Sequence, residues 1–148
     1  HRSIRRDWMS NLAAFFAQNV QRDIVEEVVI SDRFKDENGK PIPWKIRAIS
    51  EEENEQLRKA ATQFVKGKGG QRTPEIQPEV YLAKVAVASV VFPDLKNAEL
   101  QKSYGVLGAE DLLKKMLLSG EYAKLLEKVQ EINGFDKDIN ELIDEVKN

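Results

Sequence analysis

Apolar residues recur along most of this 148-residue chain at the three- and four-residue spacing of amphipathic helices. The spacing predicts helices at 10–20, 50–66 and 78–91, three short helices between 97 and 133, and a last helix at 136–146. The segment 78–91 is apolar nearly all round, which is typical of a helix at the centre of a core or one covered on its second side by another chain.

Capping residues mark several of these helix ends. Ser50 is followed three residues later by Glu53, which is the pattern of a capping box at a helix start. Asn133 and Gly134 predict a helix stop, because glycine adopts the left-handed conformation that such a stop needs. Phe135 then stands where a residue just past the stop packs back onto the last helical turn.

Two runs, 28–34 and 43–49, alternate apolar and polar residues with the period of a β-strand. Asn38–Gly39 between them is a favoured hairpin turn. We therefore predict a β-hairpin, at about residues 28–49, with Trp44 as its largest apolar side chain. Because an isolated hairpin is marginal in water, it must pair with a third strand, lie on a helix or extend a partner's sheet.

The stretch 67–77 combines three glycines with a proline and predicts a mobile linker, with a basic interaction loop as the alternative. We predict an α+β fold, a predominantly helical single domain with one β-hairpin followed by a helical bundle. Its parts are an extension or disordered N-terminus at 1–9, a hairpin-containing part at 10–66, the mobile loop at 67–77, a helical part at 78–135 and a C-terminal amphipathic helix at 136–148.

Composition argues against most catalytic chemistry. The chain has no cysteine, and its one histidine is residue 1, so thiolate nucleophiles, histidine bases and multi-histidine metal sites are not expected. A net charge of -2 disfavours nucleic-acid binding by bulk electrostatics. No run approaches the ~20 apolar residues that span a bilayer. We predict a protein that is not an enzyme, with no catalytic, metal or cofactor site and no membrane segment.

Two long runs carry a resemblance to a known family. They are RFKDENGKPIPWKIRAISEEENEQLRK and FPDLKNAELQKSYGVLGAEDLLKKMLLSGEYAKLLEKVQEINGF. Both resemble the XkdN-like phage tail assembly chaperones of Gram-positive phages and defective prophages. The resemblance extends from Ser10 to about Phe135; the first eight residues and the tail after Phe135 lie outside it.

The resemblance implies a chaperone in the bacterial host cytoplasm that binds the tape measure protein, a long and largely helical polypeptide, and keeps it soluble until the tail tube polymerises. The tail tube protein is a second candidate partner, and a homo-oligomer is left open. Exposed apolar residues would make the contacts, and the candidates are Phe16, Tyr104, Leu107, Leu117, Leu118 and Tyr122. The alternative function is a small nucleic-acid-binding or regulatory module of a mobile element, based on N-terminal arginines and the basic stretch 66–72.

Overall fold

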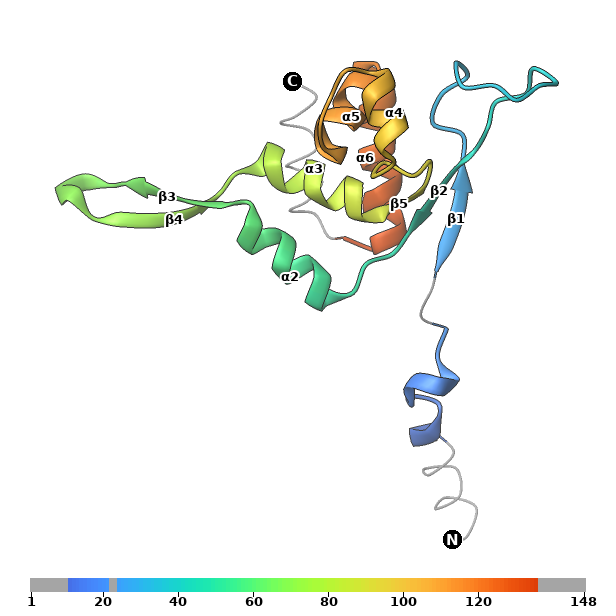
Figure 1. Ribbon diagram of the computed structural model, residues 1–148. Coiled ribbons are helices and arrows are strands. Elements are labelled where there is room, and N and C mark those ends of the chain that lie inside the picture. The colour runs from blue at the N-terminus through green and yellow to red at the C-terminus, as the bar shows by residue number, and fades with distance from the viewer. Residues whose placement is uncertain (1–10, 22–23, 136–148) are drawn as a thin grey trace, which may run out of the picture.

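The structure, a computed structural model, describes residues 11–21 and 24–135 of the chain. Its elements form one α+β unit in which helices pack against one side of a small antiparallel sheet (Figure 1). This confirms the predicted fold class. The predicted final helix at 136–146 and the division at residue 9 fall outside the described residues.

The sheet has three strands in the order β1-β2-β5. They are β1 (Val25–Val28), β2 (Trp44–Arg47) and β5 (Val90–Phe92). β1 and β2 form the predicted hairpin, and β5 supplies the third strand that such a hairpin needs. The strand predicted at 28–34 is shifted, because the chain leaves the ladder after Val28. Ser31 and Arg33 instead bond to the end of a distant helix.

The core lies between β2 and three helices. α3 (Pro78–Ser89), α5 (Ala109–Met116) and α6 (Ser119–Asn133) surround it, and α2 (Glu51–Ala60) and α4 (Ala98–Ser103) flank it. The Ser50–Glu53 capping box at the start of α2 is confirmed. α6 ends at Gly134, which has a φ of 62°, as predicted. The fully buried members of the core include Ile46, Val85, Ala86, Leu112, Leu113 and Leu125.

Asn133 joins three parts of this core at the last turn of α6. Its Oδ1 accepts the backbone N–H of Ile49 at 2.7 Å. Its Nδ2 donates to Ser89 Oγ at 3.3 Å and to the carbonyl of Val129 at 2.9 Å. Ser89 looks like a polar interruption of the apolar helix 78–91, yet it is completely buried and bonded to Asn133.

Replacing Asn133 with alanine is therefore expected to lower the free energy of unfolding by about 1–3 kcal/mol, since the Ile49 N–H and the Ser89 hydroxyl lose their partner. Urea denaturation measures this loss. Lys124→Ala, on the exposed face of the same helix, is the control and should change stability by less than about 0.5 kcal/mol. Equal values for the two variants would show that the Asn133 bonds contribute nothing to stability.

The largest correction concerns residues 61–77. α2 stops at Ala60, where the sequence predicts a helix to residue 66. The predicted linker is instead part of a second antiparallel hairpin, β3 (Thr62–Lys66) and β4 (Arg72–Ile76). Thr62 Oγ1 donates to the Arg58 carbonyl at 2.7 Å and so satisfies one of the last carbonyls of the helix. The β-branched and aromatic residues that follow fit a strand better than a helix.

Two smaller predictions are also wrong, and a third is displaced by two residues. The helix predicted to residue 91 ends at Ser89, and Val90–Phe92 joins the sheet. The predicted break between the second and third short helices is present, but it falls at Leu117 and Leu118, and Ser119 and Gly120 form the first turn of α6. The helix predicted at 10–20 is not continuous: residues 14–16 form turns, and only a short 3-10 helix, η1 (Ala17–Asn19), follows.

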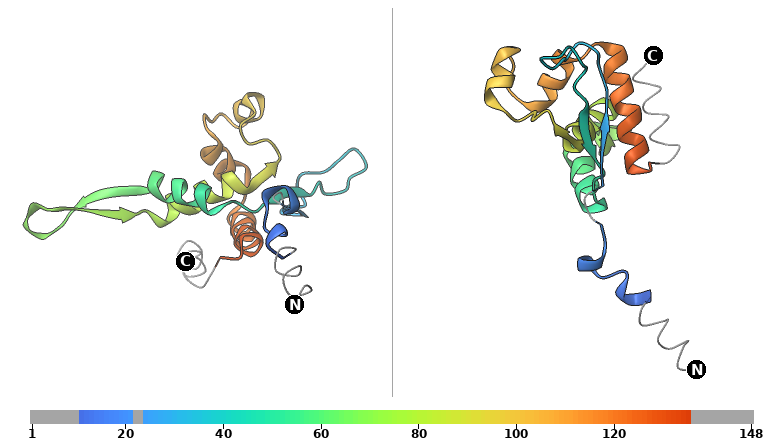
Figure 2. Two further views of the ribbon diagram at one scale, coloured as in Figure 1. Left: turned by 90° about the horizontal axis from the view of Figure 1, so that it is seen from below. Right: turned by 90° about the vertical axis from the view of Figure 1, so that its right-hand side faces the viewer.

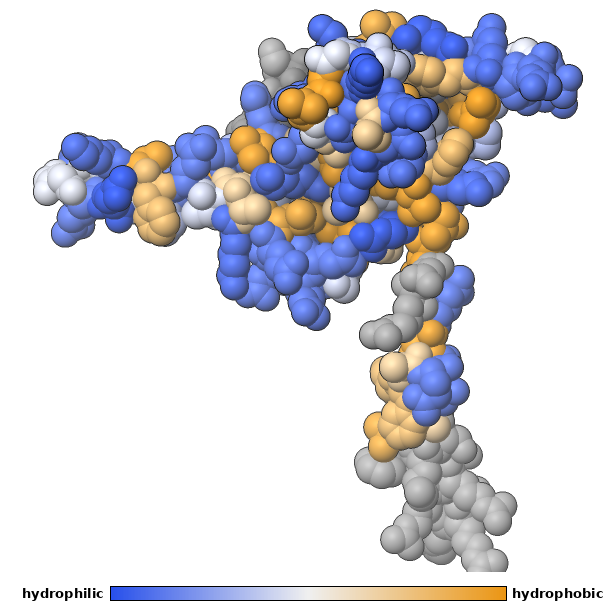
Figure 3. Space-filling view, in the orientation of Figure 1, coloured by the Kyte–Doolittle hydropathy of each residue, from blue (hydrophilic) through white to orange (hydrophobic). Residues whose placement is uncertain are grey.

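Two arms leave the body of the molecule. The β3–β4 hairpin extends away on the side opposite the β1–β2 sheet, and the N-terminal segment extends below it (Figures 1 and 2). Apolar surface is visible on the hairpin, on the N-terminal segment and beside β1 (Figure 3). The large apolar side chains exposed there include Phe15, Phe16, Ile24, Val25, Phe64 and Ile76.

Candidate partner-binding groove

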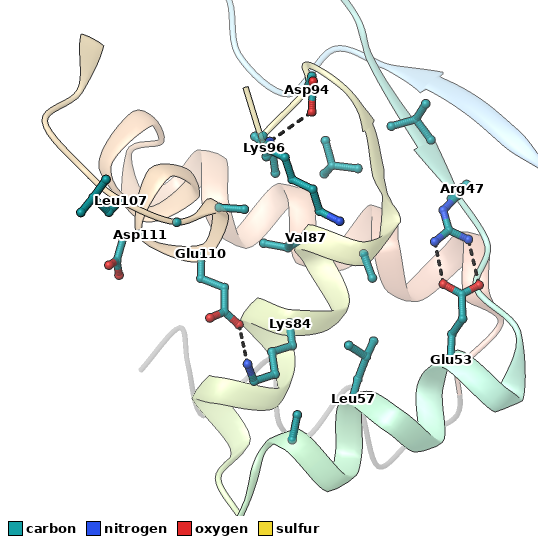
Figure 4. Close-up of a pocket in the computed structure, with 17 residues that line it drawn as sticks. Arg47, Glu53, Leu57, Lys84, Val87, Asp94, Lys96, Leu107, Glu110 and Asp111 are labelled. Atoms are coloured by element: carbon teal, nitrogen blue, oxygen red, sulfur yellow. Dashed lines mark hydrogen bonds and ion pairs between the residues drawn. The ribbon is translucent and has the colours of Figure 1, made fainter. Parts of the chain in front are cut away.

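A groove of about 780 Å³ opens on the body of the protein between α2, α3, β5 and the segment 94–111. The close-up in Figure 4 shows α2 and α3 as two of its walls, with Leu57 on α2 and Val87 on α3. This volume lies within the ~300–1,000 Å³ typical of binding pockets. The groove is therefore large enough to take several side chains of a partner.

The floor of the groove is apolar. Its apolar lining residues come from all four neighbouring elements and are Leu57, Ala60, Val87, Ala88, Val90, Val91, Leu95, Leu107 and Ala109. Val87 and Val90 are half-buried against the core, whereas Val91 is exposed. Since α3 carries apolar residues all round, one of its sides completes the core and another forms this floor. Burying such a surface against a partner would be favourable.

Charged side chains of both signs surround the floor. Arg47 Nη2 lies 2.6 Å from Glu53 Oε2, and Lys84 Nζ lies 3.2 Å from Glu110 Oε1 (Figure 4). The hydrogen bond from Arg47 holds the pKa of the Glu53 carboxyl below its usual value. Asp94, Lys96 and Asp111 also line the groove, so four acids stand beside three bases and the rim is close to neutral. It suits an amphipathic helix with mixed charges rather than a highly charged ligand.

Leu107 is the predicted partner-binding residue that lies at this groove. Its side chain is 92% exposed at the end of the segment before α5. Gly108 follows it with a φ of 107°, a conformation that favours glycine. An exposed leucine beside an apolar floor is a natural anchor for a partner.

The other predicted candidates lie elsewhere. Phe16 is exposed on the N-terminal segment, and Leu118 is 60% exposed just before α6. Tyr104 and Tyr122 are half-buried against the core. Leu117 is only 7% exposed and belongs to the core, so its side chain is not available to a partner. The six candidates therefore do not form one surface.

Tyr122 illustrates how the core constrains one of these candidates. Burial raises the pKa of its hydroxyl to about 12, and the carboxylates of Glu110 and Glu79 add to the shift. The hydroxyl therefore stays protonated at neutral pH. Tyr122 lies on α6 and packs against the core, close to the Lys84–Glu110 pair in the wall of the groove.

An ion pair fixes the start of α6 against the β1–β2 connection. Arg33 Nη2 lies 2.5 Å from Glu121 Oε1 and also donates to the Met116 carbonyl at 2.8 Å. Ser31 Oγ donates to Glu121 Oε2, and the backbone N–H of Leu118 donates to Oε1 at 2.8 Å. These bonds lower the pKa of Glu121 to about 2, with the hydrogen bond from Arg33 as the largest cause.

Of the residues that line the groove, sequence reasoning had proposed Leu107 alone as a partner-binding candidate. The one signal in the sequence was the lack of a polar face on α3. It predicts that the second side of the helix is covered, but it does not show where the covering surface lies. Val90 and Val91 were expected within the helix and lie in β5 instead. The floor combines α2, α3, β5 and a loop, so no local spacing reveals it.

Among residues 11–21 and 24–135, no group of three or more acidic or histidine side chains could hold a metal ion. Within the same residues no helix is long and apolar enough to cross a membrane.

A profile of the phage XkdN-like tail assembly chaperone protein family matches residues 12–147. The phage-like element PBSX protein XkdN of Bacillus subtilis (strain 168) is 35% identical over 123 residues, which cover 82% of this chain and 83% of that protein. The uncharacterized protein YqbN of the same organism is 36% identical over 132 residues, or 88% of each protein.

The fold agrees with this relationship. The crystal structure of the protein YqbN is similar with a TM-score of 0.73 and 31% identity, over 84% of this chain and 96% of that one. The profile, both relatives and the solved structure thus agree over most of the length. This chain belongs to the phage XkdN-like tail assembly chaperone family.

Proposed function

We propose that this protein binds the tape measure protein of its phage or prophage and keeps it soluble until the tail tube assembles around it. The observation that supports this most directly is the apolar groove with a charge-balanced rim, in a member of a tail assembly chaperone family. An amphipathic helix places its apolar face in such a groove and its charged face at the rim. A largely helical tape measure protein offers many such helices.

Binding of this kind requires no covalent chemistry. We propose that the protein works in the host cytoplasm as a reversible cover for apolar helix faces, without catalysis. Each contact must be weak enough for tube subunits to displace it, so retention depends on many copies acting along one partner. The tail tube protein, which would displace the chaperone, is a second proposed partner.

Co-expression with the tape measure protein of the same phage or prophage tests the proposal. The chain should raise the soluble fraction of that protein and co-purify with it. The paired change Leu107→Asp with Val91→Asp alters two exposed residues of the groove and should weaken co-purification at least about tenfold, since losing an apolar anchor costs more than about 1.4 kcal/mol. Thermal denaturation should show that this variant remains folded.

Leu118→Asp is the matched control, because Leu118 is an exposed leucine outside the groove. It should leave co-purification unchanged. Loss of binding in Leu118→Asp alone would place the contact near the start of α6 and contradict the groove. A chain that leaves the tape measure protein insoluble, and instead retains DNA with a steep dependence on salt, would favour the nucleic-acid alternative.

A further inference from the structure

The β3–β4 hairpin stands apart from the body of the protein. Its five residue pairs run from Thr62 opposite Ile76 to Lys66 opposite Arg72. At its base the backbone N–H of Gln77 donates to the Ala61 carbonyl at 2.8 Å. Figures 1 and 2 show no other described segment beside the two strands. A two-stranded hairpin without a covering layer is marginally stable in water, so this one is suited to a partner.

One face of the hairpin combines exposed apolar groups with positive charge. Phe64 is 64% exposed, and Ile76 lies on the same face because the pairs Thr62–Ile76 and Phe64–Pro74 are two residues apart. Lys66 and Arg72 stand directly opposite each other near the tip. Like charges in this position destabilise an isolated hairpin. A carboxylate from a partner would offset this repulsion.

The two outer edges of the hairpin are not equivalent. β4 contains Pro74, and a proline in an edge strand has no N–H to donate and lies with its nitrogen towards solvent. That edge is therefore closed to regular pairing. β3, with the sequence TQFVK, has no proline and offers a complete set of backbone donors and acceptors. If the hairpin extends another sheet, β3 is the strand that pairs.

A matching free edge lies at the other side of the molecule. β1 is the outer strand of the three-stranded sheet, with the sequence VEEV and no proline. Ile24, Val25 and Val29 expose apolar side chains along it. Glu26 and Glu27 make no ion pair with any residue of the described ranges. This edge is acidic and apolar, whereas β3 and its turn are basic and apolar.

We propose that β3 of one copy of this protein adds to the free edge of β1 of a second copy. The hairpin and β1 lie on opposite sides of one molecule, so the pairing must join different copies (Figures 1 and 2). The combined sheet would have the strand order β5-β2-β1 from the second copy, followed by β3 and β4 from the first. In a pair of copies, one still has its hairpin unused and the other still has its β1 edge unused. The contact is therefore head-to-tail and extends into rings or filaments.

Sedimentation velocity across a range of protein concentrations tests this pairing. The unaltered chain should form assemblies larger than dimers as its concentration rises. Lys66→Glu, which damages the hairpin surface, and Glu26→Lys, which damages the β1 surface, should each weaken self-association at least tenfold. An equimolar mixture of the two variants should also grow, because the intact hairpin of one pairs with the intact β1 edge of the other and the two exchanged charges attract each other. Both changes in one chain should restore growth.

Arg72→Glu is the matched control. It and Lys66→Glu both place opposite charges at the same pair of the hairpin, so both should leave the hairpin folded. Only Lys66→Glu alters the strand that pairs. Self-association should therefore survive Arg72→Glu at close to its original strength. Equal weakening by both changes would overturn the assignment to β3.

A disulfide measurement tests the contact independently of these charge changes. The chain has no cysteine, so a Gln63→Cys chain can be mixed with a Glu26→Cys or a Glu27→Cys chain and oxidised. Residues 26 and 27 point to opposite faces of β1, so one mixture should cross-link well and the other poorly. Absence of cross-links in both mixtures would overturn the proposal. A chain that stays monomeric at every concentration would also overturn it. So would a chain that binds nucleic acid and loses that binding through Lys66→Glu.

Discussion

Replacing Leu113 with alanine is expected to lower the free energy of unfolding by about 2–5 kcal/mol, whereas Leu107→Ala should change it by less than about 0.5 kcal/mol. Leu113 is completely buried on α5, and Leu107 is 92% exposed six residues earlier. The same side chain is truncated in both variants. The buried site loses its transfer free energy and gains a cavity, while the exposed site loses almost no contact.

Denaturant unfolding followed by circular dichroism measures both variants under one set of conditions. Leu117→Ala should resemble Leu113→Ala, because Leu117 also lies in the core. Co-purification with the tape measure protein should show the opposite order. Leu107→Ala should weaken co-purification more than Leu113→Ala does. A large loss of stability in Leu107→Ala would contradict its placement on the rim of the groove.

Replacing Glu121 with alanine is expected to cost about 1–3 kcal/mol, because its carboxylate accepts hydrogen bonds from Arg33, Ser31 and the backbone of Leu118. The pKa of Glu121 is about 2, below its ordinary value of 4.5. Unfolding therefore raises its proton affinity. The stability that it contributes is complete above about pH 4.5 and is lost as the pH falls towards 2.

Measuring the free energy of unfolding from pH 7 to pH 2 checks the sign. The unaltered chain should lose more stability over this range than Glu121→Gln does, because glutamine has no proton to bind. Glu51→Ala is the control: Glu51 also lies in the first turn of a helix and forms an ion pair with Arg58 at 3.0 Å, but it is much more exposed. It should cost no more than about 1 kcal/mol. Equal acid sensitivity in the unaltered chain and in Glu121→Gln would contradict the role of Glu121.

The proposed self-association would complement the proposed function. Copies joined from β3 to β1 would each present one groove, so a row of copies would offer many weak sites to one long helical partner. Linked weak sites retain a partner far better than single sites do. They still release the partner when a competitor displaces the contacts one at a time. The two proposals can fail separately, since one depends on residues of the groove and the other on the edges of two strands.

Several features of the fold could be predicted from local sequence. Ser50 with Glu53, Asn97 before α4, and Gly134 after α6 each act through hydrogen bonds or backbone angles within a few residues. The turn at Gly39 is equally local, with Asp36 Oδ1 accepting the N–H groups of Asn38 and Lys40 at 2.8 and 2.9 Å. The long runs shared with the family likewise predicted the fold class and the family itself.

Errors arose where two local preferences competed. Residues 62–66 continue an apolar spacing that a helix could use, but their β-branched and aromatic side chains pair with 72–76 across a glycine turn. Val90 and Val91 could have extended α3, but they belong to β5, which pairs with β2. In both places the pairing partner lies outside the window in which periodicity is measured.

The sequence by itself determined the helix caps, the tight turns, the apolar face of each helix in the core and the membership of a chaperone family. These features depend on neighbouring residues or on long runs of matching residues. Only the tertiary structure decided that α3 shares its apolar surface between the core and a groove, that Leu117 is buried while Leu107 and Leu118 are not, and that β3 and β1 are left as free edges. The physical reason is that exposure and edge position are properties of packing between distant segments.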